Sequence, residues 1–347
     1  MILNTHSNNI SQESLRNSYV FSIDKGVTDW MKFIAAFVVV LHHYTQYAVG
    51  ALHNSNFIFQ LFSNYGGTVG VAIFFFFSGY GLMESELKSH LSPLAFFKRR
   101  FLKIYMPVIL VTALWIVIYY AILRNVGISI NLFDFTSTDY FSFIQEFAFG
   151  FFDPILWFIK VILVLYPAFY IFTWLRQKNE WIAWLFFATS VFIIRYLAQI
   201  WIGEFAKFSI PFFAIGVLSS EFKRLNWNIL NISLIPIVLY GIIELSLGVK
   251  YTLFLCTIIS LIIIIFTAYK PKLACPALIA ALSFDIYLVH YKIFLSLREV
   301  MPGISLCIFL IFTAIGGGIF YCIRKYLILP THSRKNKLFT SLPKINN

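Results

Sequence analysis

The first long apolar run of this 347-residue chain, residues 29–49, contains ionisable side chains at helical spacing. Asp29 and Lys32 are three residues apart, so they can pair on one helix face. Lys32 and His43 are eleven residues apart, which puts both on the same face, about 16 Å apart along the axis. Ionisable groups are costly inside an apolar helix, so we interpret this set as lining a polar pathway. The alternative is that Lys32 extends to the interface while His42 and His43 cap the helix end.

A second polar stripe lies near the C-terminus, in the apolar run 275–295. Ser283, Tyr287 and His290 follow one another at i, i+4 and i+7, which is one face of a helix. Asp285 places a second carboxylate in the same run. A lone His in an apolar helix is usually a hydrogen-bonded core residue, but a stripe of polar groups favours the lining of a cavity.

Between these two regions is the segment Lys98-Arg99-Arg100-Phe101-Leu102-Lys103, a basic loop followed by Pro107. Arg99, Arg100 and Lys103 could bind the phosphates of a nucleotide-like ligand, for which Arg offers bidentate contacts. They could equally bind lipid head groups or only set membrane topology. Charge alone favours topology. Upstream, Ser78 lies in a glycine-rich run that predicts close helix packing.

The elements that position these residues are predicted to be transmembrane helices. The chain is 60% hydrophobic and only 12% charged, about half the charged fraction of a soluble domain. We therefore expect an all-α, polytopic membrane protein of about ten helices. Runs long enough to span a bilayer fall at roughly 29–49, 66–86, 104–123, 154–175, 181–200, 205–220, 229–247, 251–269, 275–295 and 303–326. Of these, 205–220 is short, and the amphipathic stretch 141–153 is predicted to be re-entrant or interfacial.

The basic residues predict the orientation of the helices. With the N-terminus inside, 19 of the 27 Lys and Arg residues fall in inside segments, four in outside loops and four within runs. This bias predicts that both termini are cytoplasmic. It also explains the net charge of +12 without a nucleic-acid partner.

Three segments follow from this reading: a polar tail at 1–24, a transmembrane domain at 25–330 and a basic tail at 331–347. The first apolar run is too long for a signal peptide, so we expect no cleaved leader. The four cysteines have no metal-like spacing and are interpreted as small apolar residues. No metal site is expected.

Six segments of the chain together resemble the acyltransferase-3 family of membrane acyltransferases. They occur in the family's order over residues 24–330: Asp29-Trp30-Met31-Lys32 with His43, Gly70 with Ser78-Gly79-Tyr80, the basic segment 98–107, Leu156-Trp157-Phe158, Pro211-Phe212-Phe213-Ala214-Ile215-Gly216, and Ser283 with Tyr287-Leu288 and His290. Two departures stand out. The family's usual Arg is Lys32 here, which keeps the charge but loses the planar fork. Ile162 stands where one branch of the family has Glu, so the chain looks closer to the stand-alone sugar or polysaccharide O-acyltransferases.

The resemblance implies transfer of an acyl group, most often acetyl, from acyl-CoA to a hydroxyl of a cell-surface glycan or glycolipid at the plasma membrane. His43 would be the general base or carry the acyl group, and Lys32 with Asp29 would orient the donor. Arg99, Arg100 and Lys103 would hold the CoA phosphates. The cavity would be lined by Ser78, Tyr287, His290 and Asp285. Acyl-CoA would be a substrate, with no permanently bound cofactor.

Two other classes of protein share parts of this pattern. A polysaccharide or lipid-linked sugar transporter would also have many helices and a polar intramembrane path, although such folds often consist of two similar halves, which this sequence lacks. A membrane glycan polymerase or ligase typically has Arg-rich outer loops, whereas the predicted outer loop 124–153 is acidic.

Overall fold

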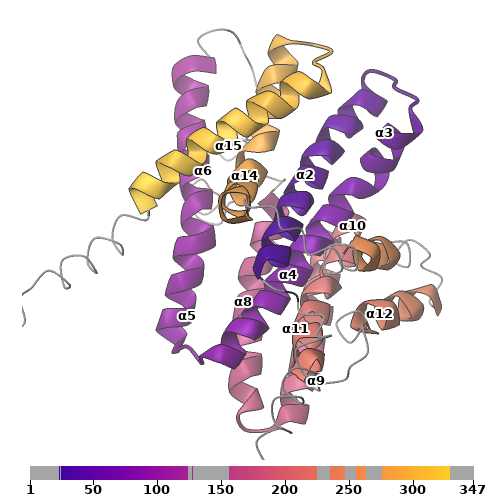
Figure 1. Cartoon of the computed structure of the whole chain (residues 1–347), viewed down its shortest axis with the longest axis vertical. Helices are drawn as coiled ribbons and strands as arrows, with labels where there is room; N and C mark the ends of the chain where they lie inside the picture. The colour runs from indigo at the N-terminus through magenta and orange to yellow at the C-terminus, as the bar shows by residue number, and fades with distance from the viewer. Residues whose placement is uncertain are drawn as a thin grey trace, which may run out of the picture.

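The computed structural model describes residues 23, 25–123, 127, 156–224, 235–246, 255–262 and 276–328. Within these ranges all regular secondary structure is helical, as the sequence predicts (Figure 1). The α-helices are α2 (Lys25–Gly50), α3 (Phe57–Leu61), α4 (Gly67–Lys88), α5 (Pro93–Arg100), α6 (Met106–Ile118), α8 (Trp157–Arg176), α9 (Glu180–Trp201), α10 (Glu204–Ser209), α11 (Pro211–Arg224), α12 (Ile235–Ser246), α14 (Pro276–Val300) and α15 (Leu306–Ile328). Three π-helical turns adjoin them: η1 (Phe62–Gly66) joins α3 to α4, η2 (Phe101–Tyr105) joins α5 to α6, and η3 (Tyr119–Leu123) follows α6.

Seven helical segments in the described ranges are long and apolar enough to cross a bilayer. They are Lys25–Gly50, Phe57–Lys88, Pro93–Ile122, Trp157–Arg176, Glu180–Ile200, Leu278–Val300 and Leu306–Leu327. On α9 the side chains of Trp181, Leu185 and Phe192 are largely exposed. Such an apolar outer face is stable in lipid and costly in water, so the chain is an all-α polytopic membrane protein.

The seven spans match seven of the ten predicted runs, and the run 205–220 differs from the prediction. There α10 ends at Ser209 and α11 begins at Pro211. Proline has no N–H to continue the hydrogen-bond ladder of a helix, which explains the break. The predicted runs 229–247 and 251–269 are described only at 235–246 and 255–262, and 141–153 lies outside the described residues.

The basic segment 98–103 was expected to be a loop but is helical. It continues from α5 through the turn η2 into α6. The wide turn immediately precedes Pro107, whose missing N–H would otherwise leave a carbonyl of the preceding turn without a helical partner. The cations therefore project from a rigid helix rather than from a flexible connection.

The central packing contact joins α4 to α11 and confirms the expected use of small residues. A Cβ atom on Gly79 would lie 2.0 Å from the Phe213 carbonyl oxygen, and one on Gly216 would lie 2.0 Å from the Phe76 carbonyl oxygen. Only glycine lets the two backbones approach so closely. Two of the segments that carry the family resemblance thus form one helix crossing.

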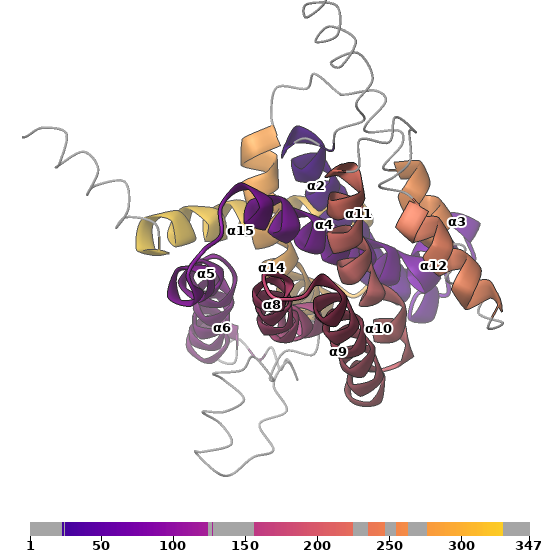
Figure 2. The same cartoon turned by 90° about the horizontal axis from the view of Figure 1, so that it is seen from below.

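Around this crossing, α2 packs against α4 and α14, and α14 also packs against α15 and α6. Figure 2 shows α6 on one side of α8 and α9 on the other. The α4–α5 and α8–α9 turns lie at one end of the molecule, and the α2–α3 turn lies at the other (Figure 1). The predicted topology requires this alternation. That the end with the α4–α5 and α8–α9 turns is cytoplasmic stays a prediction.

Candidate active site

His43 on α2 faces α14. Its ring centroid lies 5.3 Å from that of His290 and 4.9 Å from that of Tyr291. The His43 side chain is half-buried, and His290 is fully buried. The structure therefore brings together two histidines that the sequence places on the first and the ninth predicted helices.

The neighbouring His42 is held away from this contact. Its Nδ1 donates a hydrogen bond to the Phe62 carbonyl oxygen at 3.0 Å. Its ring also lies against Gly67, where a Cβ atom would come within 2.6 Å of Nε2. His42 thus ties α2 to the start of α4, and His43 is the ring presented to α14.

The ring of His290 is oriented by its own helix. Its Nδ1 lies 2.7 Å from the Tyr287 carbonyl oxygen, which can only accept, so Nδ1 carries the proton and a neutral ring has its lone pair on Nε2. The Tyr287 ring packs against Phe74 of α4 and Phe158 of α8, with centroids 5.5 and 6.0 Å away. The predicted stripe on α14 therefore faces the interior of the bundle. Its first member, Ser283, is buried and donates to the Ala280 carbonyl oxygen at 2.8 Å.

A concentration of positive charge lies toward the N-terminal end of α2. Lys32 is influenced by the charges of Lys25, Arg100 and Lys103, and by that of Asp29. Lys103 is in turn influenced by Arg324 of α15. We call the five cations Lys25, Lys32, Arg100, Lys103 and Arg324 the basic cluster. Asp29 attracts Lys32 through its charge, although no ion pair joins the two in the described part of the chain.

The predicted phosphate-binding residues differ in where they point. The Arg100 guanidinium lies over the rings of Phe96 and Tyr166, 5.4 and 5.6 Å from their centroids. Its Nε is buried and has no hydrogen-bond partner in the described structure. Lys103 is exposed and acts on Lys32, whereas Arg99 is exposed and is not among the charges that influence Lys32. Arg100 and Lys103 thus join Lys32, while Arg99 stands to one side.

Ser78 and Asp285 were expected to line the same cavity, and the structure gives each a distinct setting. Ser78 is half-buried on α4, beside the Gly79 crossing with α11. Asp285 is fully buried and accepts two hydrogen bonds from Arg324, from Nε and from Nη2, both at 2.7 Å. In the sequence, Arg324 lies near the end of the last predicted run, 303–326, and was counted only among the 19 inside cations. Because Arg324 lies four residues before the end of α15, its side chain can still reach into the helix bundle.

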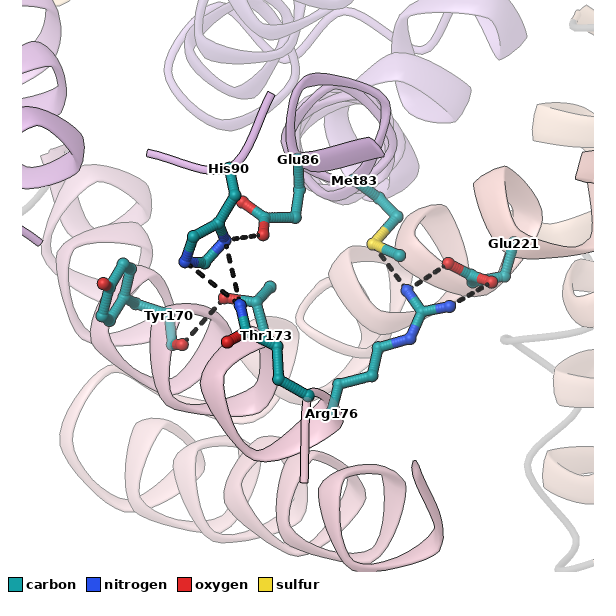
Figure 3. Close-up of polar contacts among 8 residues, drawn as sticks. Met83, Glu86, His90, Tyr170, Thr173, Arg176 and Glu221 are labelled. Carbon is teal, nitrogen blue, oxygen red and sulfur yellow. Dashed lines mark hydrogen bonds and ion pairs between the residues drawn. The ribbon is translucent and has the colours of Figure 1, made fainter. Parts of the chain in front are cut away.

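A second polar network lies where α4, α8 and α11 meet (Figure 3). Arg176 of α8 donates to both carboxylate oxygens of Glu221 on α11, at 2.5 and 2.9 Å, and its Nη1 lies 4.0 Å from the Met83 sulfur. The Ser220 hydroxyl donates to Glu84 at 3.0 Å. We call this region the acid-matched junction, because Arg176 is paired with the carboxylate of Glu221.

The same network continues along the end of α4 (Figure 3). His90 pairs with Glu86 one turn earlier, and the Gln177 side-chain nitrogen Nε2 lies 3.2 Å from His90 Nε2. The Thr173 hydroxyl donates to the Tyr170 carbonyl oxygen at 2.9 Å. These residues give no distinctive signal in the sequence, since each lies at the end of an apolar run, where polar side chains are ordinary.

Comparison of the chain with known protein families identifies one family model that matches most of its length. The family model described as an acyltransferase domain, the acyltransferase-3 model, matches residues 28–324. Neither a curated protein nor a solved structure matches the chain. The match spans all six segments that carry the resemblance, and it includes His43 on α2 and reaches along α15 as far as Arg324. The chain therefore belongs to the acyltransferase-3 family and is a membrane acyltransferase that transfers groups other than amino-acyl groups.

Proposed function

We propose that the protein transfers an acetyl group from acetyl-CoA to a hydroxyl of a cell-surface glycan or glycolipid, at the plasma membrane. One observation carries the proposal. A single helix, α2, presents Lys32 to the basic cluster and His43 to the two aromatic side chains His290 and Tyr291 of α14. A site for a polyanion and a candidate base are thus connected by about three turns of one helix.

The donor fits this separation. Coenzyme A carries its phosphates at one end and its thioester at the other, joined by a long flexible arm. Phosphates bound by Arg100 and Lys103 would let the thioester reach His43. Arg99, which is exposed, would add long-range attraction more than direct contact. The excess positive charge of the cluster supports an anionic donor, since like charges repel strongly in a low-dielectric setting.

The chemistry follows from the imidazole. A sugar hydroxyl is a weak nucleophile at neutral pH, so it needs a base in reach. His43 takes the hydroxyl proton as the oxygen attacks the thioester carbonyl carbon, and the tetrahedral intermediate expels the thiolate. The thiolate then receives the proton, which leaves an ester and free CoA. The other route, in which His43 first accepts the acetyl group on a ring nitrogen, uses the same residue and gives the same products.

His290 would support either route as a positioning residue. Its Nδ1 proton is committed to the Tyr287 carbonyl oxygen, 2.7 Å away, so a neutral His290 offers only a lone pair from Nε2 toward its surroundings. Lying against His43, that ring would favour one orientation of the base. Asp29 and Lys32 would orient the donor at the other end of the path.

The test compares adjacent histidines of α2. Cells lacking the gene are complemented with wild type, His43→Ala or His42→Ala, at matched protein levels in the membrane. Surface glycans are analysed by mass spectrometry for acetyl groups, and isolated membranes are assayed with radiolabelled acetyl-CoA. Loss of the general base should lower the transfer rate about 10²- to 10⁴-fold, whereas His42→Ala should keep most of it. A His43→Ala protein with wild-type transfer would refute the assigned role.

The exporter alternative makes a different prediction in the same experiment. Deletion would then remove the surface glycan itself rather than its acetyl groups, and membranes would not consume acetyl-CoA. Neither the described structure nor the comparisons favour that alternative. Analysis of the glycan with and without the gene also distinguishes acetyl from larger acyl groups by the mass that is lost.

A further inference from the structure

The ion pair between Asp285 and Arg324 is the feature that the proposed mechanism does not use. Arg324 Nε donates to Asp285 Oδ1 and Arg324 Nη2 to Oδ2, both at 2.7 Å. Nη2 also lies 3.5 Å from the Ala281 carbonyl oxygen. The Arg324 side chain is 14% exposed, and the Asp285 side chain is 0% exposed. Such side-on geometry fixes the plane of the guanidinium and leaves Nη1 on the side away from the carboxylate.

A buried pair of this kind could simply join α14 to α15. The acid-matched junction contains a pair that does so: Arg176 and Glu221 also form a two-bond contact, here end-on through Nη1 and Nη2, between α8 and α11, and are 19% and 17% exposed. The difference between the two pairs lies in their neighbours. Arg324 is one of the charges that act on Lys103, and Lys103 and Arg100 both act on Lys32.

Among the residues that the structure describes, the charges around Arg324 do not balance. The basic cluster contains five cations, drawn from α2, α5, η2 and α15, and the carboxylates identified with it are Asp29 and Asp285. Concentrating like charges at the edge of a low-dielectric bundle costs free energy, and an anionic ligand offsets that cost. If the Asp285–Arg324 pair only joined α14 to α15, nothing would require its arginine to lie among other cations.

We infer that Arg324 is a further donor-binding residue, which offers Nη1 to a phosphate group of acyl-CoA, and that Asp285 is the positioning residue that holds it. The inference rests on the proposed function, because it adds Arg324 to the site assigned to Arg100 and Lys103. It also accounts for the full burial of Asp285 in α14, five residues before His290. The pair connects the helix of the candidate active site to the donor's anionic end.

The experiment replaces the pair without leaving a lone buried charge. Asp285→Asn with Arg324→Gln is the test variant, and Arg176→Gln with Glu221→Gln is the matched control. Purified proteins are compared for melting temperature, for CoA affinity by calorimetry, and for the KM and kcat of acetyl-CoA consumption. We expect the test variant to raise the KM and the CoA Kd about tenfold or more, as loss of a charge-assisted hydrogen bond does, with little change in kcat. The control should keep the wild-type KM while losing a similar amount of thermal stability.

Two further variants protect the test against misfolding. Arg324→Lys keeps the charge but loses the fork, and should restore part of the CoA affinity lost in the test variant. The exchange Asp285→Arg with Arg324→Asp keeps an ion pair but moves the cation to α14, so it should restore stability more than affinity. Wild-type KM and Kd in the test variant, or full recovery of affinity by the exchange, would show that the pair only joins two helices. If wild type neither binds CoA nor consumes acetyl-CoA, the proposed function fails instead.

Discussion

Two polar regions near the ends of the spans, the acid-matched junction and the basic cluster, differ in how far their cations are paired with carboxylates. At the acid-matched junction, Arg176 meets Glu221 and His90 meets Glu86. In the basic cluster, Lys32, Arg100 and Lys103 gather, and the acids identified with them in the described part of the chain are Asp29 and Asp285. A balanced network satisfies itself and stabilises the fold, whereas an unbalanced one needs a ligand of opposite sign. Changes in the first region should therefore affect stability, and changes in the second should affect donor binding.

The largest effect expected from this comparison is on stability. Glu221→Ala removes the main partner of a largely buried pair and leaves Arg176 only the exposed Glu180, 3.8 Å away, as a carboxylate partner, which should cost about 3 kcal/mol of unfolding free energy. Thermal unfolding in detergent, followed by tryptophan fluorescence, measures the loss. The protein that remains folded should bind CoA with wild-type affinity. Weakened CoA binding at full stability would remove the distinction between the two regions.

The next effect is on binding. Arg100→Ala should raise the KM for acetyl-CoA about tenfold to a hundredfold, since a charge-assisted contact to phosphate contributes about 1.5–3 kcal/mol. The melting temperature should change little, because Arg100 has no ion pair to lose in the described structure and only its contacts with Phe96 and Tyr166 disappear. Steady-state kinetics on purified protein separates KM from kcat. A drop in kcat at constant KM would instead place Arg100 near the reacting atoms.

The sequence predicted most of the helices that carry these regions, but not which side chains of different helices meet. Seven spans were predicted because hydropathy over about 20 residues is a local property. The spacing of Lys32 and His43 was equally local. The contact of His43 with His290 was not predicted, because it depends on how α2 packs against α14.

The errors have equally specific causes. Arg324 looked like an ordinary inside charge, since topology and ligand binding both place cations at the ends of spans. Its two bonds to Asp285 are visible only in the structure, and its role in donor binding stays a proposal. The break between α10 and α11 occurs at Pro211, which lies inside the predicted run 205–220 and which hydropathy does not distinguish from its apolar neighbours. The helical form of the basic segment was missed because four cations in six residues resemble a loop.

A third prediction concerns Lys32 on α2, which carries a positive charge but lacks the planar fork of an arginine. Lys32→Ala should lower kcat/KM for acetyl-CoA about tenfold, as loss of a charged hydrogen-bonding partner does. Lys32→Arg should stay within about threefold of wild type, because both residues carry the same charge at the same place. Kinetics on the two variants, at equal amounts of folded protein, provides the measurement. Equal losses in both variants would indicate that the shape of the side chain matters more than its charge.

The smallest expected effect is that of Arg99, and it tests whether position or charge count governs donor binding. Arg99 is exposed and lies beside the basic cluster rather than in it, so Arg99→Ala should raise the KM less than about threefold, as for other solvent-screened charges. Adding salt to shorten the screening length to a few ångströms, about 3 Å at 1 M, should abolish that difference. The penalty for Arg100→Ala should persist, because a half-buried contact is screened less. Lys98→Ala is the matched control, since Lys98 is equally exposed one residue earlier. If Arg99→Ala matched Arg100→Ala at both salt concentrations, donor binding would depend on the number of cations near the membrane surface rather than on their placement by the helices.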